Sequence, residues 1–215
     1  MARDGHTFSA YLVNPDAKAR GAIVVLQEIF GLTSHIRSIA DSYAADGYLT
    51  IAPALFDRIR RDVVLGYSPP EVERGMGYRL QVPIAKALLD IAACAAVVRH
   101  AGRVAVLGFC WGGTLAWTAA SSVPLAAAVC YYGSKMLEQS SKTPSCPTLL
   151  HFGERDSHIP LSEVEALRAA YPSGEYHLYP AGHAFANADR PDRYDAQAAS
   201  LARTRTHAFL AQHLG

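Results

Sequence analysis

A cysteine between glycines, Cys110 in Gly108-Phe109-Cys110-Trp111-Gly112-Gly113, is the residue of this chain best placed to act as a nucleophile. The short apolar run 103–107 predicts a buried strand before it, and the run 114–120 predicts a helix after it. A strand and a helix this close together require a sharp turn, which glycines permit. Such a turn lifts the side chain above the sheet and directs it towards the helix N-terminus. The alternative is a glycine-rich turn that contains a buried cysteine without chemical function.

A nucleophilic Cys110 requires a base and an acid that orients this base, because a thiol with a pKa of about 8.5 is mostly protonated at neutral pH. Asp156 lies in a polar loop after a predicted strand, and Glu154 in the same loop is the competing acid. His183 lies in a glycine-containing loop after the next predicted strand. The order nucleophile, acid, histidine predicts a triad of Cys110, Asp156 and His183.

Among the nine histidines of the chain, His158 is the rival of His183 for the role of base, since it lies in the same loop as Asp156. His183 is favoured because it follows the acid by a further strand, as the expected chain order requires. His151 falls within an apolar strand pattern, which favours a hydrogen-bonded core position.

Two backbone N–H groups near Cys110 are expected to stabilise a negatively charged carbonyl oxygen, each by about 3 kcal/mol. The turn supplies the first, the N–H of Trp111 at the start of the predicted helix. The loop after the predicted strand 22–26 supplies the second, for which the N–H of Ile29 is the best candidate. The dipole of the same helix favours the thiolate form of Cys110.

Strand and helix patterns alternate along the chain without repeats or low-complexity linkers. The predicted strands are 6–13, 22–26, 48–52, 103–107, 125–132, 147–152 and 175–179. The predicted helices begin at the N-cap Ser34, at Glu71 with a break at Pro83, after Cys110, at Leu161 and near Pro191. This alternation predicts an α/β fold, a mostly parallel central sheet covered by helices on both faces. With 215 residues, 50% of them hydrophobic, we expect a single domain over residues 1–215.

The composition excludes several classes of function. A net charge of +1, from 20 basic and 19 acidic residues, gives no field that would attract nucleic acid or an anionic membrane. The longest apolar runs have eight residues, which is too short to span a bilayer, and the first residues do not resemble a signal peptide. The four cysteines form no Cys-x-x-Cys pair, and no metal-ligand or nucleotide-binding motif is present. We therefore expect a reduced cytoplasmic protein without cofactor or metal, either a monomer or a small homo-oligomer.

Four segments, 27–31, 108–113, 153–156 and 181–185, together resemble the dienelactone hydrolase family, in the same order and over nearly the whole chain. The resemblance implies an α/β-hydrolase fold. It also implies an enzyme that cleaves a small-molecule ester or lactone, dienelactone-type or a related small carboxylic ester, through a Cys110–His183–Asp156 triad and a thioacyl-enzyme intermediate. The family's own lactone carries a carboxylate. Its broader members hydrolyse other esters and lactones.

The resemblance places Glu28 beside the thiol, either as an alternative base or as a charge that suppresses the reactivity of the resting enzyme. Considered alone, a carboxylate at a strand end would be interpreted as a solvated or ion-paired surface residue. The resemblance also adds Phe30, in the same segment, to the residues that contact the substrate.

Substrate recognition is where the sequence departs from the family. Arg74 and Tyr78 match an Arg-x-x-x-Tyr pattern that contacts the substrate carboxylate, and their spacing places both on one helix face. The family has a second arginine four positions after the catalytic histidine. Asn187 stands there in this chain, as a further substrate-contact position, and Arg190 is a candidate substitute.

Two other kinds of function are compatible with parts of this pattern. A thiol-based redox or peroxide-responsive protein would use Cys110 as an oxidisable thiol, but no resolving cysteine stands near it in sequence. A non-catalytic binding protein on a hydrolase fold would be expected to lack triad residues, and all three are present.

Overall fold

Seven strands form one central sheet in the computed structural model, which describes residues 1–139 and 142–215. Across the sheet their order is β1-β3-β2-β4-β5-β6-β7. The strands are β1 (Ala10–Val13), β2 (Ala22–Leu26), β3 (Leu49–Pro53), β4 (Val104–Phe109), β5 (Ala127–Tyr131), β6 (Thr148–Gly153) and β7 (Glu175–Tyr179). The edge strand β1 pairs antiparallel with β3, and all the other pairs are parallel. The expected mostly parallel sheet is confirmed.

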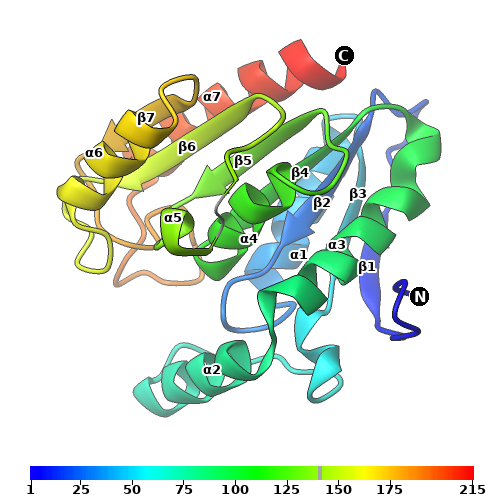
Figure 1. The fold of residues 1–215 in the computed structure, drawn as a ribbon, viewed down its shortest axis with the longest axis horizontal. Coiled ribbons are helices and arrows are strands. Elements are labelled where there is room, and N and C mark those ends of the chain that lie inside the picture. The colour runs from blue at the N-terminus through cyan, green and yellow to red at the C-terminus, as the bar shows by residue number, and fades with distance from the viewer. Residues whose placement is uncertain (140–141) are drawn as a thin grey trace.

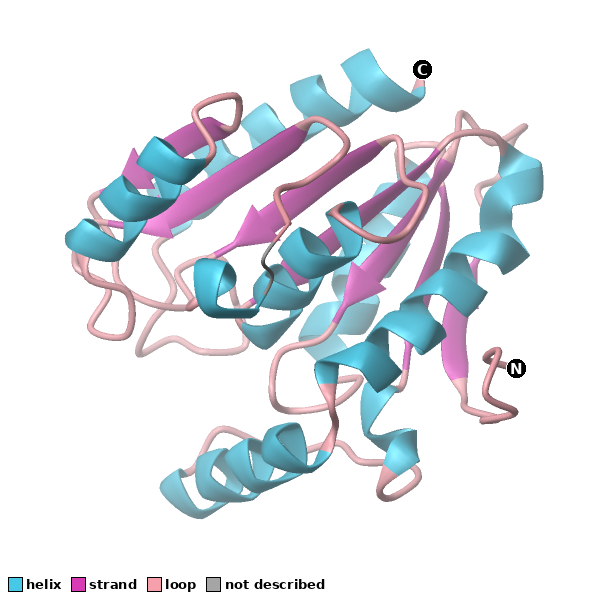
Figure 2. Cartoon of the chain, viewed as in Figure 1, coloured by secondary structure: helices cyan, strands magenta, loops and turns pink. Residues whose placement is uncertain are grey.

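Helices cover both faces of this sheet, with α3 and α4 in front of it and α1 and α7 behind it (Figures 1 and 2). Because both faces are covered, every residue of β2, β4, β5 and β6 is buried. The helices are α1 (Ser34–Ala45), α2 (Pro69–Gln81), α3 (Ile84–Val98), α4 (Trp111–Ala120), α5 (Met136–Gln139), α6 (Leu161–Ala170) and α7 (Ala196–Leu214), with 3-10 turns at Leu55–Arg58 and Arg99–Ala101. The layered arrangement is that of an α/β-hydrolase fold.

Element boundaries differ from the sequence-based ones where local hydrogen bonds decide them. The N-cap of α1 is Thr33, whose hydroxyl accepts the Ile36 N–H, and not Ser34, whose hydroxyl donates to Asp189 at 2.5 Å. Helix α7 begins at Ala196 and not near Pro191, because the side chain of Asp195 accepts the Ala198 N–H. Strand β1 begins at Ala10, four residues after its predicted start, since backbone hydrogen bonds close a turn over the first residues.

The segment between β3 and α3 contains the 3-10 turn Leu55–Arg58 and helix α2. Helix α2 begins at Pro69, two residues before the predicted start, where Glu71 accepts the Gly66 N–H at 2.8 Å. Gly75 of α2 lies so close to the loop after β2 that a Cβ atom there would be 2.2 Å from the carbonyl oxygen of Ile29. This contact holds α2 against the loop that was expected to supply an N–H donor.

Arg58, which follows β3, is part of a partly buried ion-pair network. Its guanidinium lies 2.7 Å from Asp90, which is fully buried on α3, and 3.0 Å from Asp4. A buried carboxylate is stable only with a charged or hydrogen-bonded partner, and Arg58 supplies both.

No single helix among the described residues is long and apolar enough to cross a membrane. Only α2 and the helical stretch 84–101 taken together reach that length, and they are bent by 87°.

Candidate active site

Cys110 occupies a strained turn between β4 and α4, with φ of 53° and ψ of −118°. Positive φ is unfavourable for a residue with a side chain, so the surrounding packing must enforce it. A Cβ atom on Gly108 would lie 2.0 Å from the Gly112 carbonyl oxygen, and one on Gly112 would lie 2.5 Å from that of Leu26. The two glycines therefore permit the approach of α4 to β2 and β4 that the sequence pattern predicts, and Cys110 stands at the carboxyl edge of the sheet.

The structure brings Cys110, His183 and Asp156 into one hydrogen-bonded chain. His183 Nε2 lies 3.3 Å from Cys110 Sγ, and His183 Nδ1 lies 2.7 Å from Asp156 Oδ2. The other carboxylate oxygen of Asp156 accepts the backbone N–H of His158 at 2.8 Å, which fixes the acid. Asp156 follows β6 and His183 follows β7, so parallel pairing places both beside the turn. Glu154, the competing acid, has an exposed side chain.

The groups around His183 favour its protonated form. Burial by itself would lower the pKa of His183, but the adjacent Cys110 and Asp156 raise it to about 10. An imidazole with this pKa keeps its proton at neutral pH when a negatively charged sulfur faces it. The arrangement therefore favours a protonated His183 facing the sulfur of Cys110.

The two histidines that were weighed against His183 occupy different environments. His158 is exposed, and its ring meets that of His183 edge-on with the ring centroids 4.9 Å apart. Its link to Asp156 is through its backbone. His151 is fully buried between Tyr179 Oη, at 2.8 Å, and Thr206 Oγ1, at 3.0 Å, so its predicted core position is confirmed.

The two predicted N–H donors lie in elements that touch each other. Trp111 is the first residue of α4, and the loop containing Ile29 follows β2, against which Gly112 is packed. Within residues 1–139 and 142–215, neither the Trp111 N–H nor the Ile29 N–H donates a hydrogen bond to another protein group. Both donors are therefore free to bind a substrate oxygen.

Glu28 is almost completely buried, at 2% exposure, and Asn187 Nδ2 donates to its Oε2 at 2.7 Å. Burial raises the pKa of Glu28 to about 7, although the charges of His183 and Arg190 and the Asn187 hydrogen bond oppose this shift. The alternative interpretation of Glu28 as a solvated or ion-paired surface residue is therefore wrong.

Asn187, which we expected as a substrate contact, lies beside Glu28. Its side chain is fully buried, and its amide nitrogen is engaged by Glu28 and by Tyr67 Oη at 3.3 Å. The partnership with Glu28 joins residues 159 positions apart, so no local sequence pattern indicates it.

The other predicted substrate contacts lie on α2 and in the loop after β2. Arg74 is exposed on α2, and Tyr78 on the same helix packs against Phe56 with ring centroids 5.5 Å apart. Phe30 is buried against Tyr67, with ring centroids 4.7 Å apart. Helix α2 lies beyond the carboxyl ends of β2 and β4 (Figure 1).

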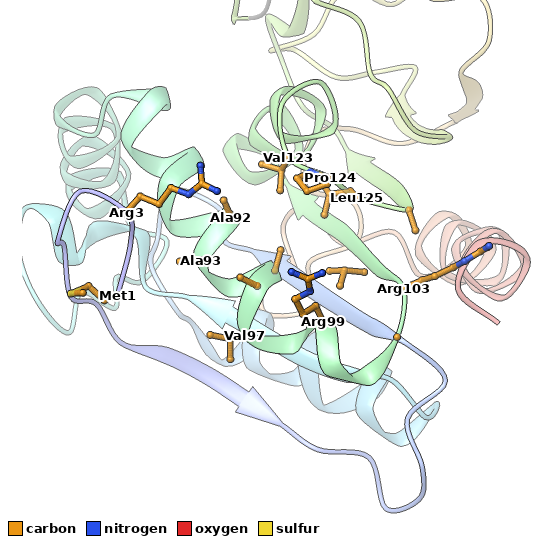
Figure 3. A pocket seen from close by; sticks show the side chains of 15 residues that line it. Met1, Arg3, Ala92, Ala93, Val97, Arg99, Arg103, Val123, Pro124 and Leu125 are labelled. Atoms are coloured by element: carbon orange, nitrogen blue, oxygen red, sulfur yellow. The ribbon is translucent and has the colours of Figure 1, made fainter.

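A separate groove of about 860 Å³ lies at the opposite end of the sheet, where β4 and β5 begin (Figure 3). Ala92, Ala93, Val97 and Arg99 form one of its sides, and Val123–Leu125 form the other. It contains no residue of the Cys110–His183–Asp156 chain. This groove is therefore separate from the candidate active site.

Comparisons with known proteins agree on one family. The profile described as "Dienelactone hydrolase family" matches residues 8–214. The "Putative carboxymethylenebutenolidase" of Yersinia pestis is 36% identical over 231 residues, covering 97% of this chain and 85% of its own. The "Carboxymethylenebutenolidase" of Pseudomonas putida is 32% identical, covering 97% of this chain and 92% of its own. The crystal structure of the "Putative Dienelactone Hydrolase" of Klebsiella pneumoniae has a TM-score of 0.80 at 33% identity, covering 97% of this chain and 94% of its own.

These matches span nearly the whole chain and agree with the fold and with the strained turn at Cys110. The chain belongs to the dienelactone hydrolase family and is a hydrolase of lactones or esters.

Proposed function

We propose that this enzyme cleaves its ester or lactone through attack of the Cys110 sulfur on the substrate carbonyl carbon. The observation that carries this proposal is the continuous chain Cys110–His183–Asp156, with distances of 3.3 and 2.7 Å, on a strained turn at a helix N-terminus. A sulfur held beside an imidazole that is itself fixed by a carboxylate is the arrangement that nucleophilic catalysis requires.

In the first half-reaction, the thiolate of Cys110 forms a bond to the carbonyl carbon, and the carbonyl π electrons move to oxygen. The N–H groups of Ile29 and Trp111 are proposed to hold this oxyanion. When the tetrahedral intermediate collapses, the carbon–oxygen bond of the ester breaks, and His183 gives its proton to the departing oxygen. For a lactone, this oxygen stays attached to the acyl group, which is now a thioester of Cys110.

In the second half-reaction, His183 removes a proton from water as the water oxygen attacks the thioester carbon. Collapse of the second intermediate breaks the carbon–sulfur bond and returns the thiolate of Cys110 and the imidazolium of His183. The product is a carboxylic acid, which ionises at neutral pH. Asp156 keeps Nδ1 of His183 protonated throughout, so Nε2 always faces the reacting atoms.

Glu28 is proposed to set the charge around the thiol before the substrate binds. In its anionic form it opposes the thiolate, and in its neutral form it does not. Its pKa of about 7 means that both forms are present near neutral pH.

We further propose that the substrate carries a carboxylate and that Arg74 and Tyr78 bind it. Two relatives bear the name carboxymethylenebutenolidase, which denotes an enzyme that acts on a lactone with a carboxymethylene group. Arg74 is exposed on α2, on the same side of the helix as Tyr78, and its neighbour Gly75 packs against the loop that carries Ile29. A guanidinium in this position offers a charge-assisted hydrogen bond to an anion.

Arg74→Ala is expected to raise KM for carboxylate-bearing lactones about tenfold to a hundredfold and to leave neutral aryl esters nearly unchanged. The lost charge-assisted hydrogen bond is worth about 1.5–3 kcal/mol and is made only by the anionic substrates. The measurement is kcat and KM on a panel of lactones and aryl esters with and without a carboxylate.

Arg79→Ala on another side of the same helix is the matched control, and it should change neither substrate class. An equal loss for both classes in Arg74→Ala would show that Arg74 is structural. If no member of the panel were turned over, the proposed substrate class would be wrong.

A further inference from the structure

Asn187 has a side-chain orientation that its neighbours determine. Its Oδ1 accepts the backbone N–H of Asp189 at 3.0 Å, so its Nδ2 must face Glu28 Oε2 and Tyr67 Oη. An amide nitrogen can only donate hydrogen bonds, which makes Glu28 Oε2 an acceptor in every protonation state. This donor favours the placement of a proton on Oε1 in neutral Glu28, because the carbonyl oxygen of a carboxylic acid is the better acceptor.

Glu28 also lacks a direct cationic partner. Within the described part of the chain, no Lys, Arg or His nitrogen forms an ion pair with it. The guanidinium of Arg190 lies over the ring of Tyr67, 5.3 Å from its centroid, and pairs with Asp192 at 3.1 Å. A buried carboxyl that receives only a neutral donor is poorly stabilised as an anion.

The groups whose charges act on Glu28 come from several elements. The loops after β7 contribute His183, Asp189 and Arg190. The loop before α2 contributes the hydroxyl of Tyr67. Tyr132, which follows β5, has its pKa raised by burial and then by the charges of Glu28 and Cys110. Among the residues that the structure describes, Asn187 is the one group that is both hydrogen-bonded to the Glu28 carboxyl and unable to change its own charge.

We propose that Asn187 is the positioning residue of Glu28, which directs the exchangeable proton of this carboxyl to Oε1 and holds it with a neutral donor, so that Glu28 switches between a neutral and a charged form beside Cys110. This inference rests on the proposed function, because it takes Cys110 as the reactive thiol. It assigns Asn187 to the control of thiol reactivity, a role distinct from binding the substrate.

The sign of the effect follows from the two forms of Glu28. Its pKa is raised to about 7, so it is neutral below this pH and negatively charged above it. The negative charge disfavours the thiolate of Cys110, so the rate at which Cys110 reacts with iodoacetamide should rise less steeply once Glu28 is charged, with an inflection whose midpoint lies at about pH 7. Removing the Asn187 donor destabilises the charged form of Glu28, which raises its pKa further and moves this midpoint to higher pH.

The test is the rate of Cys110 alkylation by iodoacetamide between about pH 5 and about pH 9, followed by peptide mapping. Asn187→Leu and the smaller Asn187→Ser should each move the midpoint upward by about one pH unit or more. Glu28→Gln should abolish the midpoint. Asn14→Leu, at the only other asparagine of the chain and in an exposed loop, should behave as the wild type.

An unchanged midpoint in both Asn187 variants, together with its loss in Glu28→Gln, would overturn the role of Asn187. A wild type without a midpoint near neutral pH would overturn it as well. Failure of Cys110 to react faster than the other cysteines would instead contradict the proposed nucleophile. Because the readout is alkylation, an incorrect substrate assignment leaves the result unaffected.

Discussion

Replacing Cys110 with alanine is expected to lower kcat/KM for every ester and lactone substrate by a factor of about 10⁴ or more. The variant keeps the free N–H groups of Trp111 and Ile29 but has no atom that can form the acyl-enzyme. Initial rates with an aryl ester, measured beside a circular dichroism spectrum that reports the fold, provide the test. Cys110→Ser should fold and remain much slower than the wild type, because a site built for a thiolate ionises an alcohol poorly.

Cys146→Ala is the matched control for this prediction. Cys146 is a buried cysteine in the loop before β6, and its removal should leave turnover within a few-fold of the wild type. Activity of Cys110→Ala above about a tenth of the wild-type value would contradict the assignment of the nucleophile.

Replacing His183 with alanine is expected to lower the rate by about 10³-fold or more, since the thiolate loses its counter-ion and the leaving group loses its proton donor. His158→Ala is the matched control, because the centroids of the two rings lie 4.9 Å apart and, of the two histidines, His183 is the one that contacts Cys110. It should retain most of the activity in steady-state assays.

The same assays distinguish the two candidate acids, Asp156 and Glu154. Asp156→Asn should be severely impaired in kcat because His183 loses the partner of its Nδ1, whereas Glu154→Gln at an exposed position should be nearly normal. A larger defect in His158→Ala or in Glu154→Gln would reassign the base or the acid.

The sequence alone predicts the parts of the fold that rest on strong local patterns. Strands β2 and β7 have the predicted limits, because apolar or alternating residues are bounded there by clear turn signals. The order of Cys110, Asp156 and His183 along the chain also brings them together, since in a parallel sheet the loops after β4, β6 and β7 meet at one edge.

Other features depend on contacts between distant segments, which a local pattern does not contain. Arg58 pairs with Asp90 on a helix 32 residues away, and Asn187 bonds to Glu28 across 159 residues. In both cases a polar side chain is held by partners that are distant in the sequence. The position of Asn187 beside Glu28 follows from the path of the loop after β7, which tertiary packing decides.

The measurement that tests the central claim most directly is inactivation by a limiting amount of iodoacetamide, with peptide mapping of all four cysteines. Burial raises the pKa of Cys94 to about 12 and of Cys146 to about 11, and it raises that of Cys130 as well, so these three thiols should react slowly. We expect Cys110 to be labelled first, with activity falling in proportion to its labelling. Full labelling of Cys110 with activity retained, or loss of activity before Cys110 is labelled, would contradict its role as the nucleophile.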